Sequence, residues 1–230
     1  MGILKSSILR KVAMALSGLF LVVFLIQHFT INFSSVISPS TFNQWSHFMG
    51  YHGLVQFVLQ PILIFGIVFH FVMGFILEIQ NKKSRGVPYA QFKGSKNASW
   101  VSRNMIISGG VVLLFLVLHF IDFWIPEMEH KYVEGSMFNA ELIDEQRYYE
   151  ELVHKFEPYW RVIVYVLSFV FLSMHLYHGF SSSFQTLGLK NSVKKSLLLV
   201  TRAFAIVIPL GFIVIALYHH LFSVHHLPYP

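Results

Sequence analysis

Residues 12–33 read VAMALSGLFLVVFLIQHFTINF, an almost uninterrupted apolar run with one histidine, His28, near its end. A helix rises 1.5 Å per residue, so about 20 apolar residues cross a hydrocarbon core of about 30 Å. Four further runs of this kind follow along the chain. The sequence therefore predicts an all-α membrane protein forming a single transmembrane domain over residues 1–230, with five helices spanning about Val12–Phe33, Leu54–Leu77, Ile106–Ile125, Val162–Phe180 and Leu197–Leu221.

The composition supports this class and limits the chemistry. Hydrophobic residues make up 55% of the chain and charged residues 12%, and the mean hydropathy of +0.59 lies outside the range of ordinary soluble domains. The chain contains no cysteine, which excludes disulfides, iron–sulfur clusters, thiolate-ligated haem and covalently attached c-type haem on this chain. Any redox centre would have to be held by histidine or methionine.

The positions of the charged residues predict an orientation. If five helices alternate in direction, most Lys and Arg residues fall on one side, and this side is expected to be cytoplasmic. The N-terminus would then be cytoplasmic and the C-terminus outside. All acidic residues except Glu78 lie between Asp122 and Glu157, in the outer third connection. A basic cytoplasmic face suits anionic lipid headgroups or a docked soluble partner, and nucleic acid is a poor fit. The basic residues of that face are Lys5, Arg10, Lys11, Lys82, Lys83, Arg85, Lys93, Lys96, Arg103, Lys190, Lys194, Lys195 and Arg202.

Two connections show helical spacing of apolar residues. Phe42, Trp45, Phe48 and Met49 predict a short interfacial helix in the first connection. Apolar residues spaced from Phe138 to Phe156 predict a surface helix in the acidic outer connection. We expect no internal repeat.

The first four predicted spans each contain a histidine about two-thirds of the way along: His28, His70, His119 and His175. Because successive membrane helices run in opposite directions, His28 and His119 should share an outer depth and His70 and His175 an inner depth. His70 and His175 are each followed four residues later by glycine, Gly74 and Gly179, which leaves room on the same helix face.

Two pairs of facing histidines predict two bis-histidine haems stacked inside the bundle. Such a haem needs two imidazoles on opposite sides of the iron, and helices that face one another at equal depth can supply them. A tetrahedral zinc site fits less well, because it needs three or four ligands at one level. The alternative is that each histidine only forms hydrogen bonds with a neighbouring helix. Arg10, Lys11 and Arg103 are candidates for pairing with haem propionates, with contacts to lipid headgroups as the alternative.

These residues resemble a known family over nearly the whole chain: the five-helix, di-haem cytochrome b membrane anchor of succinate:quinone oxidoreductases and fumarate reductases, of the single-anchor type in menaquinone-using bacteria. The matching pieces are Leu25-Ile26-Gln27-His28, His70-x-x-x-Gly74, His119, His175-x-x-x-Gly179 with Gly188, and Phe42-Asn43 with His47-Phe48-Met49. The acidic outer connection is longer than this family leads us to expect.

The resemblance implies that His28 and His119 bind the outer haem b and His70 and His175 the inner one, with His178 as the substitute for His175. It implies an iron–sulfur subunit and a flavoprotein subunit docked on the cytoplasmic face of a bacterial inner membrane, and menaquinone as electron acceptor near the outside. No flavin or dicarboxylate motif occurs in this chain, so succinate chemistry would belong to the partners.

A quinone site requires hydrogen-bond donors beside an apolar wall. We consider Asn43, His47, Tyr51 and Gln56 as candidates, with His52 and Gln60 nearby. The alternative is that these are ordinary interfacial residues, with Trp45 and Tyr51 in an aromatic belt.

Two other functions remain open. The chain could be the cytochrome b subunit of another membrane dehydrogenase or of a hydrogenase, since a pair of haems does not define the electron donor. From a different class, a proton channel or transporter could use intramembrane histidines as a relay, although such a protein would more naturally show charged residues or broken helices midway.

Overall fold

The computed structural model describes residues 6–84, 105–189 and 191–223, and these ranges contain helices and turns but no strand. Five helical segments are long and apolar enough to cross a membrane, which confirms the predicted helical, membrane-spanning architecture. Their bounds are α1 (Ser7–Ile37); η2 (Val55–Leu59) continuing into α3 (Gln60–Ser84); α6 (Met105–His119) continuing through η3 (Phe120–Trp124), α7 (Ile125–Met128) and η4 (Glu129–Val133); α9 (Tyr159–Thr186); and α10 (Asn191–Tyr218) ending in η6 (His219–Ser223).

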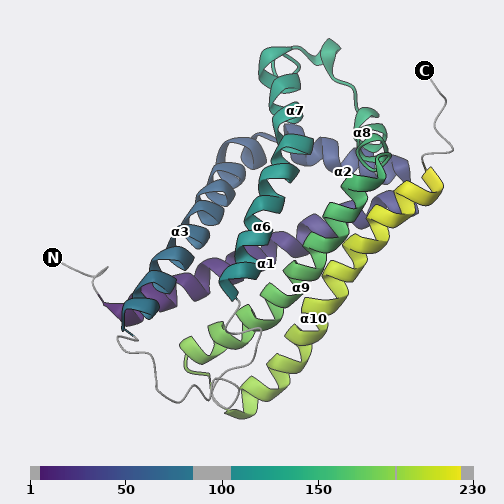
Figure 1. Cartoon of the computed structure of the whole chain (residues 1–230). Helices are drawn as coiled ribbons and strands as arrows, with labels where there is room; N and C mark the ends of the chain where they lie inside the picture. The colour runs from purple at the N-terminus through teal and green to yellow at the C-terminus, as the bar shows by residue number, and fades with distance from the viewer. Residues whose placement is uncertain (1–5, 85–104, 190, 224–230) are drawn as a thin grey trace.

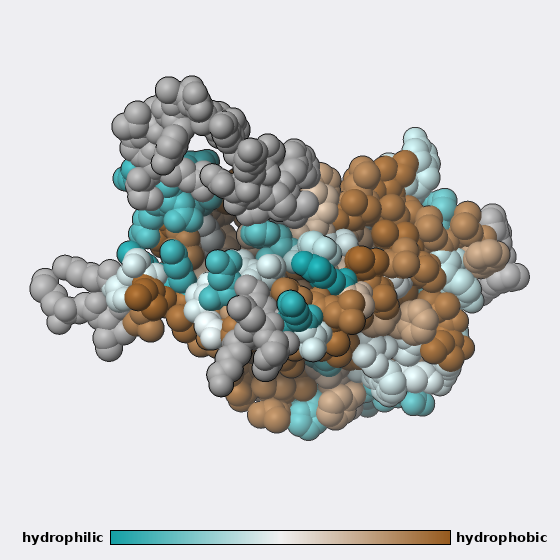
Figure 2. Space-filling view, turned by 90° about the horizontal axis from the view of Figure 1, so that it is seen from below, coloured by the Kyte–Doolittle hydropathy of each residue, from teal (hydrophilic) through white to brown (hydrophobic). Residues whose placement is uncertain are grey.

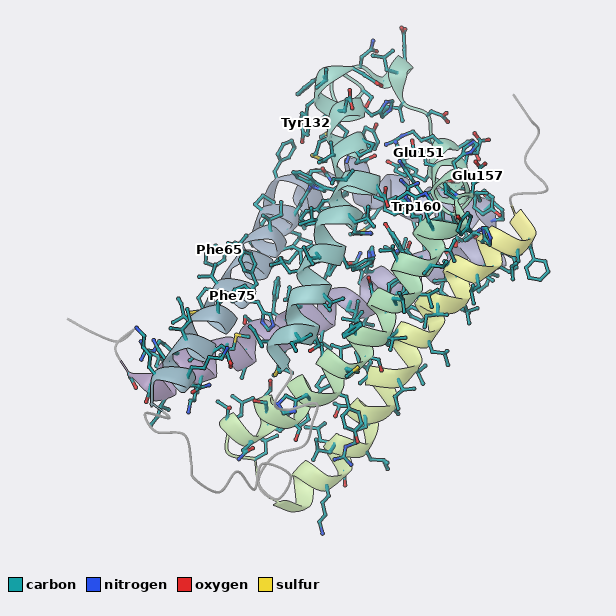
Figure 3. All side chains as sticks on the ribbon, viewed as in Figure 1. Phe65, Phe75, Tyr132, Glu151, Glu157 and Trp160 are labelled. Atoms are coloured by element: carbon teal, nitrogen blue, oxygen red, sulfur yellow. The ribbon has the colours of Figure 1, made fainter. Side chains whose placement is uncertain are left out.

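The outer surface of the bundle is apolar. Phe65 on α3 points away from the other helices (Figure 3) and is 69% exposed. Large apolar side chains are also exposed on the other four long helices, for example Val23, Leu114, Val170 and Leu199. In Figure 2, apolar residues cover broad areas of the face seen from below. An apolar surface of this extent is unfavourable in water and favourable against lipid.

Four of the long helices form a closed ring. Helix α1 packs against α3, α3 against α6, α6 against α9, and α9 against α1, while α10 lies along α9 and α1 outside this ring (Figure 1). The ring encloses the space into which the histidines of the first four spans project. A hydrogen bond of 2.8 Å between Ser35 Oγ and His219 Nε2, both buried, joins α1 to the end of α10.

Short helices cover one end of the ring, which we call the capped end. These are α2 (Pro39–Tyr51) and α8 (Arg147–Lys155), together with η2, α7 and η4 (Figure 1). Helix α2 includes the predicted interfacial segment and is capped by Ser38, whose Oγ accepts the Thr41 N–H at 3.3 Å. Phe42, Leu152, Phe156 and Phe212 belong to the buried apolar cluster that fixes this cap to α9 and α10. We call the opposite end, where α1 begins and α3 ends, the basic end.

The surface helix that we predicted from Phe138 to Phe156 is interrupted. A turn at Ala140–Leu142 (η5) is separated from α8 by residues 143–146. Ile143 has an extended backbone, and the Asp144 carboxylate accepts the Gln146 N–H at 2.8 Å. A side chain that bonds its own backbone in this way competes with helix formation and favours a turn.

The third spanning segment continues to Val133, eight residues past the predicted end at Ile125. Pro126 lacks a backbone N–H and would interrupt a regular α-helix, but the chain passes it through π-helical turns, in which the Ile125 N–H reaches back to the Phe120 carbonyl. This extension carries Glu127 and Lys131 over the capped end.

Candidate functional site

The structure places the four histidines in two pairs. The ring centroids of His28 (α1) and His119 (α6) lie 5.7 Å apart with the rings at 86°, and those of His70 (α3) and His175 (α9) lie 6.2 Å apart at 75°. Each pair joins helices that face one another across the ring, and each helix of the ring supplies one histidine.

These separations can be compared with the size of a metal–imidazole unit. A metal–nitrogen bond is about 2 Å long, so two imidazoles bound on opposite sides of one ion have ring centroids about 6 Å apart. Both observed separations lie near this value. Among the described residues, no group of three or more His, Cys, Asp or Glu side chains gathers in a way that could hold a metal ion. The histidine geometry therefore fits a two-ligand, axial arrangement at each level.

The positions of two glycines give the distance between the two histidine pairs along the bundle. A Cβ on Gly18 of α1 would lie 3.2 Å from Cε1 of His70, and a Cβ on Gly109 of α6 would lie 3.4 Å from Cε1 of His175. His28 and His119 follow these glycines by ten residues on the same helices. Ten residues of helix rise about 15 Å, so the two pairs are stacked about 15 Å apart along the bundle.

Serines next to these glycines hold the histidines nearer the basic end. Ser17 Oγ donates to the Met14 carbonyl at 2.9 Å and lies 3.0 Å from His70 Nδ1. Ser108 Oγ likewise donates to the Met105 carbonyl at 2.9 Å and lies 3.5 Å from His175 Nδ1. A hydroxyl has one proton, so in each contact the imidazole Nδ1–H must be the donor. The Nε2 lone pair is then free to bind a metal, which is the tautomer that metal-binding histidines adopt.

This arrangement reveals an internal repeat, and our expectation of none is wrong. Residues 14–28 and 105–119 both read Met-x-x-Ser-Gly followed ten residues later by His, and residues 70–74 and 175–179 both read His-x-x-x-Gly. The first two and the next two long helices thus carry the same pattern. The shared residues are few and scattered over apolar helices, so they become apparent only once contacts join Ser17 to His70 and Ser108 to His175.

A cavity of about 1210 Å³ runs inside the ring and is lined by both histidine pairs. Ligand pockets commonly measure about 300–1,000 Å³, so this volume exceeds that of one ordinary ligand. Gly18, Gly74, Gly109 and Gly179 all line it, and a Cβ on Gly74 or Gly179 would meet only the tip of a methionine, at 3.5 or 4.0 Å. These glycines leave space without side chains beside His70 and His175, and the cavity continues past His28 and His119. A cavity of this length and volume fits two flat macrocycles.

The pair nearer the capped end is surrounded by aromatic rings. Phe24 stacks on His28 at 5.3 Å, and Phe115 stacks on His119 at 5.8 Å. Asn32 Nδ2 lies 3.5 Å from His28 Nδ1, whereas the buried Nδ1 of His119 has no hydrogen-bond partner among the described residues. The helices therefore orient this pair mainly by packing, in contrast to the serine-held pair.

His178 lines the same cavity as His175. It lies three residues further along α9, and the described ring contacts of His70 involve His175 and not His178. The geometry thus brings together the four histidines that we selected first and leaves His178 beside them.

At the basic end, Lys11 lines the cavity, and the buried Nε of Arg10 has no hydrogen-bond partner among the described residues. Both side chains are available to an anionic group at this end. Arg103, the third candidate for a propionate, lies outside the described residues.

Of the four quinone candidates, all of which the structure describes, only Gln56 lines the cavity. Asn43 is buried and connects α2 to α8: its Nδ2 donates to Gln146 Oε1 at 3.2 Å and its Oδ1 accepts the Tyr149 N–H at 2.8 Å. His47 stacks on Tyr51 at 4.7 Å, and the Tyr51 hydroxyl lies 2.8 Å from Ser136 Oγ. These three residues hold the cap together.

Our sequence analysis missed a buried ion cluster at the capped end, formed by Glu127, Lys131 and Arg147. Lys131 is 1% exposed, and its Nζ lies 2.5 Å from Glu127 Oε1 and 3.2 Å from Gln56 Oε1. Arg147 of α8 pairs with the other oxygen of Glu127. The signal for the pair was the i, i+4 spacing of Glu127 and Lys131, which lie beyond the predicted end of the third span at Ile125.

The Tyr148 hydroxyl donates to Glu127 Oε1 at 3.2 Å. Burial and the negative charge of Glu127 raise the pKa of Tyr148 well above its usual range, so this hydroxyl stays protonated at neutral pH. Burial alone would lower the pKa of the Arg147 guanidinium. The nearby carboxylates of Glu127 and Glu151 outweigh this effect and raise the pKa, so the guanidinium stays charged. The cluster is thus a buried group of opposite charges at the capped end, in which Lys131, Arg147 and Tyr148 all bond Glu127.

The chain was compared with protein-family models, with curated proteins and with solved structures, and no match was found in any of the three comparisons. The fold and the site define a class only: a helical protein of the multi-pass membrane type with paired histidines inside its bundle.

Proposed function

We propose that this chain is a di-haem cytochrome b that carries electrons across a membrane between a docked soluble partner and a quinone. The observation that carries the proposal is the stacking of two histidine pairs, with ring centroids 5.7 and 6.2 Å apart, along one cavity. Two bound haems would supply one-electron carriers at two depths of the bilayer. A histidine relay for protons would not need pairs at this spacing or a cavity of this size.

In this proposal each residue of the site has a definite task. His70 and His175 offer Nε2 to one iron, because Ser17 and Ser108 accept their Nδ1–H groups. His28 and His119 hold the second iron in an aromatic, water-poor surrounding. The glycines beside His70 and His175 keep the space next to these two imidazoles clear of side chains.

The particular role rests on the family resemblance of these residues. We infer that the chain is the membrane anchor of a succinate:quinone oxidoreductase in a bacterial inner membrane, with its N-terminus in the cytoplasm. The iron–sulfur subunit and, through it, the flavoprotein subunit would dock at the basic end, where Arg10, Lys11, Lys82 and Lys83 lie. Menaquinone would accept electrons near the opposite, outer end.

The test is to isolate the tagged chain from the membranes of its own host in mild detergent. We expect flavin and iron–sulfur subunits to co-purify, and succinate to reduce the haem, followed through its visible absorption bands. If hydrogen or formate reduces the haem and succinate does not, the soluble partner is that of a hydrogenase or another membrane dehydrogenase instead. A preparation without haem would contradict the proposal altogether.

A further inference from the structure

The cavity does not end at the histidines. Beyond His28 and His119 it reaches the capped end, where it is lined by Gln60, Trp124, Glu127, Lys131 and Tyr148. Its wall is thus apolar and aromatic along most of its length and charged at this end. An elongated apolar molecule with a polar head would match both parts.

The charges at this end cancel. Glu127 pairs with Lys131 and Arg147, and Arg147 also pairs with Glu151, at 2.6 Å from Nη1 to Oε1. Two carboxylates and two cations leave no net charge for an anionic headgroup to neutralise. The ligand that fits is therefore neutral, and it needs acceptor atoms that can take up the donors left over in the cluster.

Lys131 and Gln60, which line the cavity at this end, have donor capacity left over. Arg147 Nε also has no partner among the described residues, but Arg147 does not line the cavity. The Lys131 ammonium has three protons, of which Glu127 and Gln56 accept two, and Nζ also lies 5.3 Å from the centre of the Tyr51 ring. Among the described residues no oxygen or nitrogen atom accepts the third proton. The Gln60 amide donates only to the sulfur of Met128, at 4.0 Å, which is a weak contact. The Tyr148 hydroxyl gives its proton to Glu127. A carbonyl oxygen placed here would accept from Lys131 and Gln60.

Gly50 of α2 has no side chain, which allows the ion cluster to lie directly against this helix. A Cβ there would lie 2.6 Å from the Tyr148 hydroxyl, 2.9 Å from Glu127 Oε1 and 3.4 Å from Lys131 Nζ. Any side chain at position 50 would therefore push directly into the ion cluster. Trp124, which lines the same part of the cavity, offers an aromatic face against which a flat ring can stack.

We propose that the ion cluster is the binding site for the carbonyl end of a quinone, with Lys131 and Gln60 donating hydrogen bonds to the carbonyl oxygen. This inference rests on the proposed function, which supplies the quinone as the electron acceptor. Glu127 and Arg147 are positioning residues: they hold the Lys131 ammonium at the cavity wall. The three residues of the ion cluster lie in the long acidic outer connection, to which the sequence alone assigned no function.

The test measures binding directly and does not depend on haem. The full chain in detergent micelles is titrated with dimethylnaphthoquinone, and binding is followed by the quenching of tryptophan fluorescence. Lys131→Met should weaken binding at least about 10-fold, because it removes a charged, buried donor. Gly50→Ala should weaken it as well, by displacing the cluster. Lys82→Met is the matched control, since its exposed ammonium pairs with Glu78 on α3, at the basic end, and affinity should not change.

The double variant Glu127→Gln/Lys131→Met guards against misfolding, because it leaves neither charge of the Glu127–Lys131 pair buried alone. It should fold and still bind the quinone at least about 10-fold more weakly. If Lys131→Met and the double variant both bind the quinone as tightly as the wild type, the proposed site is wrong. If these preparations still contain two haems, the proposed electron-carrier function is not affected. Binding that depends on Lys131 in a chain without haem would support the site while contradicting the proposed function.

Discussion

Ser17 Oγ lies 3.0 Å from His70 Nδ1 while giving its own proton to the Met14 carbonyl. The imidazole is therefore the donor in this contact, and its lone pair is on Nε2. Ser108 stands in the same relation to His175 on the opposite side of the ring. Two serines thus fix the tautomer of one histidine pair.

The first prediction concerns these serines. Ser17→Ala removes the acceptor of the His70 Nδ1–H, and loss of such a partner typically weakens metal binding by about 10–100-fold. We expect one of the two haems to be retained less well and to change its midpoint potential in a redox titration of the visible spectrum. Ser168→Ala is the control, because Ser168 is a buried serine whose hydroxyl, among the described residues, bonds the Val164 carbonyl of its own helix and no histidine. Equal effects of the two substitutions would show that the serine contact does not matter.

The second prediction assigns each histidine to a level. His28→Ala and His119→Ala should remove one and the same haem, and His70→Ala and His175→Ala the other, because each iron loses one of two axial ligands. Haem content and reduced-minus-oxidised spectra of the four purified variants provide the measurement. His178→Ala should retain both haems. Loss of a haem in His178→Ala with normal content in His175→Ala would move the fourth ligand to His178.

The third prediction uses a close approach of backbone and imidazole. A Cβ on Gly18 would lie only 3.2 Å from Cε1 of His70, so Gly18→Leu should displace that ring and lower the occupancy of the haem lost in His70→Ala. The other haem, held about ten residues further along α1, should remain. Gly53→Ala is the control, since nothing lies within 4 Å of the added Cβ. Loss of both haems in Gly18→Leu would indicate general misfolding instead.

The fourth prediction separates the cap from the ligand sites. Asn43→Ala breaks the hydrogen bonds to Gln146 and to the Tyr149 N–H, and we expect the protein to lose about 1–3 kcal/mol of stability. Thermal unfolding in detergent measures this loss, with the exposed Gln44→Ala as control. Affinity for dimethylnaphthoquinone should stay unchanged. If Asn43→Ala binds the quinone more weakly while its thermal stability is unchanged, Asn43 is part of the quinone site after all.

The sequence was sufficient to predict the five spanning helices and the depths of the histidines. Apolar run length predicts a membrane helix because the bilayer demands it, and alternation of direction then places His28 with His119 and His70 with His175. These inferences need only the order of residues along the chain. The third helix continues past the predicted end of its span at Ile125, because π-helical turns absorb Pro126 and such turns have no sequence signature.

The remaining parts of the site depend on contacts between distant segments. Ser17 meets His70 across 53 positions, and Lys131 meets Gln56 across 75. A serine within an apolar helix is more commonly bonded to its own backbone, as Ser168 is, so nothing in the local pattern distinguishes Ser17 from it. Asn43 was selected for its polarity and depth, but whether such a residue lines a cavity or joins two helices is decided by α8, which lies about a hundred residues further on.

The central claim is that this chain holds two bis-histidine haems. The most direct measurement is the haem content of the purified protein by pyridine haemochrome, together with its dithionite-reduced minus oxidised visible spectrum. We predict b-type haem at two per chain. A preparation from a haem-sufficient host that contains none would contradict the account, and a single haem per chain would contradict the two-level pairing of His28 with His119 and of His70 with His175.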